Sequence, residues 1–366
     1  MTFPMYIAQR FFFACFRVFV VVVLLFGLFE FIENTRRFSD KADGLSEILI
    51  VTLLGLPAQI DRILPLILLL ASLTLFIGLA RSSELVVSRA SGVSAFRVLL
   101  VPVAVALIIG ILSVAVGNPI VASTIRRYEA MRDSFDNAQR SVSSLSDEGL
   151  WLRQADSTGQ SVIRARRASP DGVTLFSVDF HVFDSAGDLT QRYIADEAHL
   201  LRDHWQLRNA AHWTAAPDSA VPPQPVARLE SVSVPTNLTS DQILESFARP
   251  ETISIWSMSE FINRMETSGF SATRHKLHLQ NLMALPVMLA AMVLIGAGFS
   301  MRHVRFGQIG TMIVVTVLSG FALFAFQNMS MSLGAAGRVP VEIAAWAPSL
   351  GAIMMMSGWL LHHEDG

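Results

Sequence analysis

Four histidines that lie close together in the sequence are the side chains best suited to metal chemistry: His181, His199, His204 and His212. Their spacing matches no standard zinc pattern, and histidines in strands or turns are commoner than metal ligands, so we expect no metal site. The one cysteine, Cys15, lies in an apolar segment, which excludes an internal disulfide and a cysteine-based metal site. The motifs Gly-x-Ser-x-Gly and His-Glu-x-x-His are absent. The residues therefore predict no covalent catalysis and no cofactor in this chain.

The lysines exclude one kind of phosphate chemistry. Only two occur, Lys41 and Lys276, and neither follows a glycine. A P-loop holds nucleotide phosphates with a lysine placed directly after a glycine in a glycine-rich loop. This chain is therefore not itself a P-loop ATPase.

A polar stretch between two apolar segments, residues 81–97, has the pattern of a short helix. Ser82 or Ser83 can cap it, Glu84 lies in its positively polarised first turn, and Gly92 can end it. Two helical turns are not stable alone in water, so we expect this helix to be docked on another surface. Its face open to another protein carries three polar side chains at i, i+4 and i+7: Glu84, Ser88 and Ser91. An ordinary polar loop is the alternative.

Basic residues follow the first and the third of the long apolar segments: Arg36, Arg37 and Lys41, then Arg126, Arg127 and Arg132. If both segments cross a membrane, these two groups emerge on the same side. An arginine can meet a phosphate with two parallel hydrogen bonds, which suits a phosphorylated lipid head. Simple anchoring to lipid headgroups would explain the same residues.

The composition is that of a membrane protein. The chain has 366 residues, of which 52% are hydrophobic and 16% charged, whereas soluble proteins carry about 25% charged residues. The net charge of −2 provides no basic field for a nucleic acid.

Six segments are long and apolar enough, at 1.5 Å per residue, to cross a bilayer of about 30 Å. Their bounds are 11–32, 63–80, 98–125, 279–301, 306–328 and 343–361. Ser94 is placed to start the helix of the third. Residues 48–57 are also apolar, but the pair Asp61-Arg62 interrupts them, so we expect the second span to begin at Ile63. The first is too long for a signal-peptide core, so we expect a retained helix.

Between the third and fourth spans the apolar period changes from helical to two. In residues 174–184 this places Phe176, Val178, Phe180 and Val182 on one face. Further strands are expected at 161–168, 189–196 and 228–234, and a helix capped by Ser257 to Glu260 and ended by Gly269. The predicted fold is a polytopic α-helical membrane protein, residues 1–125 and 279–366, with an inserted all-β domain, residues 126–278. Its apolar face is either a sealed core or a lipid groove.

The distribution of charge sets the expected topology. Six spans place both termini on one side, together with the short turns at 81–97 and 302–305, which are positive apart from Glu84. Because positively charged turns stay inside, we expect this side to be cytoplasmic. The β domain would then lie outside, in the periplasm of a Gram-negative bacterium.

The run ELVVSRASGVSAFRVL, residues 84–99, resembles the signature of the lipopolysaccharide export permeases of the LptF/LptG (YjgP/YjgQ) family. The resemblance extends over the whole chain. Gly149-Leu-Trp151 resembles the start of the family's β domain, residues 236–241 the segment after its last strand, and residues 274–277 the entry to the fourth span. These later features look closer to the LptG-type subunit. The fold that the resemblance implies is six transmembrane helices with a periplasmic β-jellyroll.

The resemblance also implies roles for the two sets of residues singled out above. Residues 82–92 would be a coupling helix in a groove of a cytoplasmic ATPase, with contacts from Glu84, Arg89, Ser91 and Gly92. The basic residues after the first and third spans would contact the lipid's phosphorylated head. Glu30 departs from the family pattern, since some relatives have a lysine there, so the charge of the cavity would differ.

The function implied is a transport subunit that extracts lipopolysaccharide from the inner membrane and passes it to a periplasmic bridge. It would pair with an LptF-like permease, two LptB-like ATPase subunits that use the ATP, and a single-helix LptC-like protein. One alternative is a membrane-anchored sensor or assembly factor whose β domain binds a protein, although six spans exceed what an anchor needs. An ion-coupled transporter is a second alternative, but the spans carry few ionisable groups.

Overall fold

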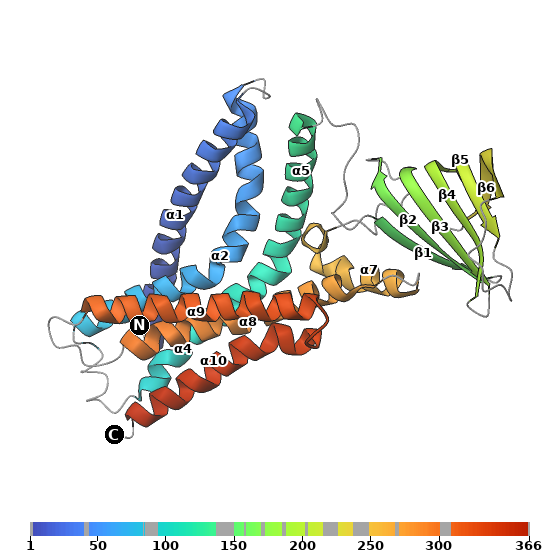
Figure 1. Cartoon of the computed structure of the whole chain (residues 1–366). Coiled ribbons are helices and arrows are strands. Elements are labelled where there is room, and N and C mark those ends of the chain that lie inside the picture. The colour runs from blue at the N-terminus through green and yellow to red at the C-terminus, as the bar shows by residue number, and fades with distance from the viewer. Residues whose placement is uncertain are drawn as a thin grey trace. The chain divides into compact units, whose positions relative to one another are not determined.

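Helices form both ends of the chain and strands its middle (Figure 1). The structure, a computed structural model, describes residues 3–39, 44–82, 84, 94–136, 150–156, 159–169, 173–184, 188–201, 204–214, 226–236, 249–267, 271–300 and 309–364. The chain divides into two compact units. The helical unit contains Met1–Phe135, Pro250–Ser259 and Thr273–Gly366, and the second unit contains Asp136–Arg249 and Glu260–Ala272.

Within the described residues, six helical segments are long and apolar enough to cross a membrane, as the sequence predicts. They are α1 (Phe3–Phe38), α2 (Leu45–Arg81), α4 (Ala95–Leu112) with α5 (Asn118–Asp136), α8 (Thr273–Ser300), α9 (Ile309–Ala335) and α10 (Val341–Glu364). A π-helical segment, η1 (Ser113–Gly117), joins α4 to α5 without a break in the helix. Ser94 caps α4 as expected, because its Oγ accepts a hydrogen bond from the Arg97 N–H at 3.4 Å.

Three of these helices are longer than expected. The second span was predicted to start at Ile63, but α2 is a single helix from Leu45 that contains Pro57 and Pro65. Its 37 residues reach about 55 Å. Prolines are tolerated in such helices because packed neighbours satisfy the freed backbone groups. Likewise α5 continues to Asp136, past the expected domain boundary at 125, and α9 continues through residues 329–335, where a loop was expected.

Helix α8 is the core of the helical unit, since nearly all side chains from Met288 to Ser300 are buried. Small residues allow its neighbours to approach closely. A Cβ on Gly110 of α4 would lie 2.5 Å from the Pro286 Cα, and a Cβ on Gly296 would lie 2.7 Å from Ser72 of α2. The Ser72 hydroxyl donates a 2.9 Å hydrogen bond to the Val293 carbonyl. Close backbone approach and hydrogen bonds through small residues are the usual way to pack helices in a membrane.

The second unit contains a single antiparallel sheet of six strands in sequential order, β1 to β6. The strands are β1 (Leu150–Asp156), β2 (Gly159–Ala168), β3 (Thr174–Asp184), β4 (Leu189–Leu200), β5 (His204–Thr214) and β6 (Val226–Pro235). The inserted all-β domain is therefore confirmed. The described strands form a meander without the Greek-key crossing of a strict jellyroll. The sequence interpretation missed β5, because a polar pair, Arg208 and Asn209, breaks its alternation.

A row of irregular positions crosses the sheet. Ser177 in β3 and Asn209 in β5 have positive φ, at 53° and 50°. Neither residue is paired with a neighbouring strand, and Asp196 of β4, which lies between them, is also unpaired. Asp196 Oδ2 accepts a 3.2 Å hydrogen bond from Asn209 Nδ2. Each irregularity reverses the side on which later residues point. The prediction that Phe176 shares a face with Val178 was therefore wrong, since Leu175 is the residue buried on one face with Val178.

The sheet bends at this row and closes on its own apolar face. Phe180 of β3 pairs with Tyr193 of β4, and Trp205 of β5 pairs with Leu200 of β4. In an extended strand, Tyr193 and Leu200 would lie over about 20 Å apart, given the rise per residue. Yet the Phe180 and Trp205 rings meet edge to face, with centroids 6.1 Å apart. Both side chains are 0% exposed. Of the two predicted alternatives, the structure therefore has a sealed core at this point of the apolar face.

Helix α7 (Ile255–Thr267) starts two residues before the predicted cap at Ser257. The carbonyl of Ser254 accepts hydrogen bonds from the N–H groups of residues 257 and 258, both at 3.0 Å. Phe261 and Ile262 are buried, as the predicted apolar face requires.

Candidate functional sites in the helical unit

Glu84 is bound by an arginine of its own chain. The Glu84 carboxylate accepts a 2.7 Å hydrogen bond from Arg10 NH1 of α1, and the same guanidinium group donates to the Tyr6 hydroxyl at 2.6 Å. Burial alone would raise the pKa of the Glu84 carboxyl, but hydrogen bonds from Ser82, Arg10 and Tyr6 outweigh it and lower the pKa overall. Glu84 is thus charged at neutral pH and joins the end of α2 to α1.

The structure describes only part of the predicted coupling helix, residues 82–92. Ser82 is not an N-cap: it is the C-cap of α2, and its N–H and Oγ both donate to the Gly78 carbonyl, at 3.1 and 3.0 Å. Arg89, Ser91 and Gly92 lie outside the described residues. The sequence interpretation also missed Arg10, because it lies 74 positions before Glu84 and only helix packing brings the two together.

The C-terminal ends of α1 and α5, the helices that carry the two basic groups, lie against each other. The ring of Phe38 in the last turn of α1 packs on Phe135 of α5, with centroids 5.3 Å apart, and both contact Val51 of α2. Arg36 and Arg37 lie in the last turn of α1, whereas Arg126 and Arg127 lie within α5, more than two turns before its end at Asp136. These four are exposed, and Arg132 of α5 is half-buried. Lys41 lies outside the described residues.

The π-helical segment η1 connects α2 and α7 to the third span. Ser113 Oγ donates a 3.0 Å hydrogen bond to Asp61 Oδ1 of α2. On the opposite side, the Trp256 indole N–H donates to the Ala115 carbonyl at 3.1 Å, and Asn118 Oδ1 accepts from the Ile255 N–H at 2.7 Å. Asn118 thereby caps the first turn of α7 from another helix. Such π-helical segments occur frequently at functional sites.

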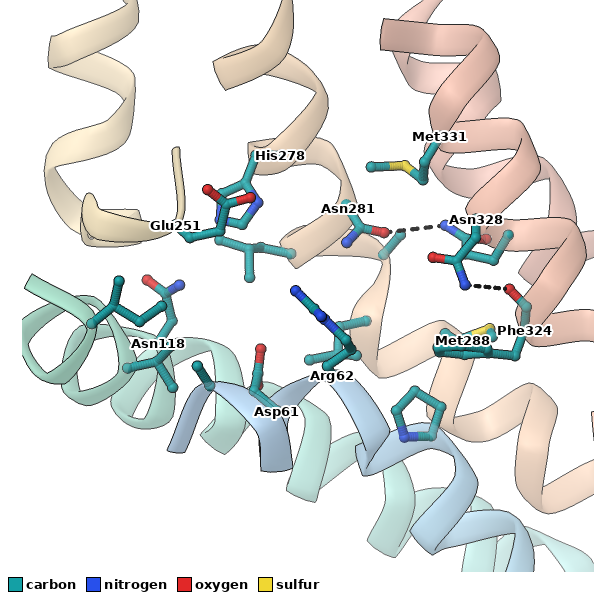
Figure 2. Close-up of a pocket in the computed structure, with 18 residues that line it drawn as sticks. Asp61, Arg62, Asn118, Glu251, His278, Asn281, Met288, Phe324, Asn328 and Met331 are labelled. Carbon is teal, nitrogen blue, oxygen red and sulfur yellow. Dashed lines mark hydrogen bonds between the residues drawn. The ribbon is translucent and has the colours of Figure 1, made fainter. Parts of the chain in front are cut away.

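A polar chamber of about 330 Å³ lies beside this segment, between α2, α5, α8, α9 and the 3₁₀ turn η2 (Pro250–Thr252). Figure 2 shows Asp61 and Arg62 pointing into it from α2. Its polar lining consists of Asp61, Arg62, Asn118, Glu251, His278, Asn281, Gln327 and Asn328. Apolar side chains, among them Pro65, Leu285 and Met288, cover the rest.

Several polar groups of the chamber have unused hydrogen-bonding capacity. Among the described residues, the exposed Arg62 guanidinium makes no hydrogen bond or ion pair, and the buried atoms His278 Nε2 and Gln327 Oε1 have no partner. Gln327 Nε2 donates to Asn281 Oδ1 at 3.1 Å, which leaves the Asn281 amide hydrogens unused. The sequence interpretation treated Asp61-Arg62 only as an interruption between spans. Two charged residues within an apolar stretch were the signal that a site lies there.

The four histidines do not gather into a metal site. His181 Nε2 lies 3.7 Å from Asp179 Oδ1, and His199 Nε2 lies 3.5 Å from Glu197 Oε2. The His212 ring stacks on the ring of Tyr193. Across the described ranges, no three potential metal ligands come together.

These features define a class: a polytopic helical membrane protein with an inserted antiparallel β domain. The family model described as "Lipopolysaccharide export system permease LptF/LptG" matches residues 5–363, so the chain belongs to this family. It is similar to the lipopolysaccharide export system permease protein LptG of Haemophilus influenzae, with 25% identity over 366 residues and 99% of each chain covered. It is also similar to LptG of Escherichia coli K12, with 24% identity over 368 residues and 98% of each chain covered. The resemblance seen in the sequence is confirmed.

Proposed function

We propose that this chain is a permease subunit that extracts lipopolysaccharide from the inner membrane and delivers it to a periplasmic bridge. One observation carries the proposal: the lipopolysaccharide export permease family matches nearly the full length, and the six spans and the inserted sheet fall in the same order as the family's implied fold. The matches to the two LptG proteins named above cover 98–99% of this chain and of each relative.

The energy would come from a separate cytoplasmic ATPase, in two LptB-like copies, because this chain has no P-loop lysine. The contact would run through residues 82–92, with Glu84, Arg89, Ser91 and Gly92. Glu84 supports this assignment, since it is charged and fixed to α1 by Arg10. A push on this residue would reach two transmembrane helices at once.

The other partners would be an LptF-like permease and an LptC-like single helix. Large apolar side chains on α1 and α9 are exposed, among them Phe29 at 72% and Leu318 at 63%. Their exposure supports contacts with partner helices or with lipid. An apolar surface of this kind needs either lipid or another helix. We place the protein in the inner membrane as a multi-pass subunit with both termini in the cytoplasm and the sheet in the periplasm.

Copurification tests this function. The chain carrying an affinity tag should bring down an ATPase and a second permease from detergent-solubilised membranes, and lipid mass spectrometry should find lipopolysaccharide in the complex. An assembly factor or sensor would instead retain a periplasmic protein and no ATPase. Recovery of phospholipid alone together with no ATPase would contradict the proposal.

A further inference from the structure

The polar chamber beside η1 offers hydrogen-bond donors and acceptors that the described chain does not use. Arg62 and the Asn281 amide supply donors, while Gln327 Oε1 and the Asn328 carbonyl oxygen supply acceptors. His278 Nε2 can do either, depending on its tautomer. Buried polar groups normally have partners, so the unpartnered His278 Nε2 and Gln327 Oε1 at one cavity point to a ligand that supplies them.

The charges of the lining disfavour a phosphate. Arg62 is positive, but the carboxylates of Asp61 and Glu251 also line the chamber. Ser113 donates one hydrogen bond to Asp61, which satisfies one carboxylate oxygen without neutralising the charge. A dianionic ligand would therefore meet one positive group and two negative ones, and like charges at short range are unfavourable.

Hydroxyl groups suit this lining better, because each hydroxyl both donates and accepts. The volume of about 330 Å³ corresponds to roughly ten water molecules at about 30 Å³ each. That space accommodates a sugar ring with a few waters. Pro65, Leu285 and Met288 supply an apolar wall against which the C–H face of such a ring can pack.

The chamber is accessible from the side of the unit where the chain leaves for the sheet and returns. Its α8 residues begin at His278, near the start of that helix, and extend to Met288. Its α9 residues, Phe324 to Met331, lie near the C-terminal end of α9. Arg62 and Asn328 are exposed, so its polar side opens outwards.

We propose that this chamber binds a sugar ring of a membrane glycolipid through Arg62, Asn281, Gln327 and Asn328. The inference rests on the proposed function, for which it supplies a carbohydrate subsite distinct from the arginines of α1 and α5. Arg62 serves as a multiple hydrogen-bond donor at this site, and its charge is secondary.

Photo-crosslinking in intact membranes tests whether the glycolipid occupies the chamber. Benzoylphenylalanine at Met331, which lines the chamber, should form an adduct whose mass is that of lipopolysaccharide with a truncated core. The control is Met354 of α10, which is 75% exposed and lies outside the chamber. An adduct mass of phospholipid or free sugar at Met331, or the same glycolipid yield at Met354, would overturn the proposal.

Substitutions then separate a hydroxyl ligand from an anion. Among the described residues, Arg62 makes no hydrogen bond or ion pair, and the exposed Asn328 side chain donates only to the Phe324 carbonyl of its own helix, so their variants should fold. For a sugar, Arg62→Leu and Asn328→Leu should each lower the Met331 adduct about three- to tenfold, the range for one or two lost hydrogen bonds, and Arg62→Gln should retain most of it. For an anion, Arg62→Gln should lose as much as Arg62→Leu and Asn328→Leu should lose nothing, which would overturn the assignment.

The readouts also separate the two proposals from each other. If lipopolysaccharide copurifies with the complex but Met331 gives no glycolipid adduct, the chamber proposal fails and the transport function stands. If neither lipopolysaccharide nor an ATPase copurifies, the function itself fails.

Discussion

Glu84 pairs with Arg10 within the chain, and we propose that it also contacts the ATPase. The free-energy cost of removing its carboxylate distinguishes the two roles. The Arg10 and Glu84 side chains are each about one-third exposed, at 34% and 30%. Ion pairs near a surface contribute about 0.2–1 kcal/mol, whereas breaking a desolvated pair at a protein interface costs about 2–5 kcal/mol. A pair that only joined α1 to α2 would therefore be of little consequence.

We expect Glu84→Ala to weaken ATPase binding by more than about thirtyfold, which corresponds to about 2 kcal/mol. Arg10→Met should have an effect of less than about fivefold, because Arg10 only positions the carboxylate. ATPase affinity of the purified permease complex measures both. If Arg10→Met and Glu84→Ala lose the same few-fold, and the exchange Arg10→Glu with Glu84→Arg restores the loss, Glu84 serves the fold alone.

The same residue predicts a pH dependence. Because the folded-state pKa of Glu84 lies below its usual value, its stabilising contribution is complete above the unfolded pKa and is lost as the pH falls through the folded pKa. The contribution of Glu84 to the stability of the folded permease should thus be constant near neutrality and be lost only in acid. In Glu84→Gln this acid-dependent part should disappear when the melting temperature of the purified permease is measured against pH.

The arginines at the outer helix ends give a second residue-level prediction. Arg36→Glu with Arg37→Glu should reduce lipid stimulation of ATP hydrolysis at least several-fold, because the reversal places two negative groups where a phosphorylated head would lie. Arg36→Lys with Arg37→Lys is the matched control, since headgroup anchoring needs only the positive charge. Unchanged hydrolysis and unchanged copurified lipopolysaccharide in the reversal variant would make these residues anchors.

At the level of elements, η1 decides how three helices meet. Pro119 has no N–H, so the Ala115 carbonyl lacks its α-helical partner and accepts from the Trp256 indole N–H. Asn118, directly after η1, caps α7. The segment that returns from the β domain is therefore fixed to the third span at two points.

The bent sheet predicts that its core does not open to lipid at Phe180. Phe180→Ala should destabilise the β domain by about 3–5 kcal/mol, since it empties a fully buried position between two arms of the sheet. The half-buried Val182→Ala is the comparison and should cost less. Limited proteolysis of the full-length protein measures both. A photo-crosslinker at Phe180 should label only protein, and acyl-chain adducts there would show that the apolar face opens.

At the level of the whole molecule, the six spans fix which segments share a side of the membrane. Because successive crossings alternate sides, we expect both termini and the connections at 81–97 and 302–305 on one side, and the two connections to the sheet on the other. The arginines of those short connections favour the cytoplasm for the first side.

Reporter fusions test this topology. A reporter after Asp184 should be active only in the periplasm, and reporters after Gly92 or His303 only in the cytoplasm. Truncation at a fusion point can change the orientation of a helix, so full-length sandwich fusions are the control. A cytoplasmic signal from the Asp184 position in both formats would exclude the transport function proposed above.

The sequence by itself determined the membrane class, the number of spans, the inserted β domain and the family. Each depends on local composition: a span of some twenty apolar residues needs no partner to be recognised, and alternation of period two is visible within one strand. The stretch at residues 84–99 carried the family because its residues are contiguous.

Only the tertiary structure decided the Arg10–Glu84 pair, the polar chamber and the bend of the sheet. Arg10 and Glu84 are 74 positions apart, and the Ser72–Val293 hydrogen bond that aligns α2 with α8 joins residues 221 apart. Hydropathy fixes that a helix enters the membrane, but not which of its faces meets which neighbour. The positive φ at Ser177 likewise reverses the faces of β3, and its neighbours in sequence give no sign of it. Packing between distant segments determines where the unused polar groups of Arg62 and Asn281 come together.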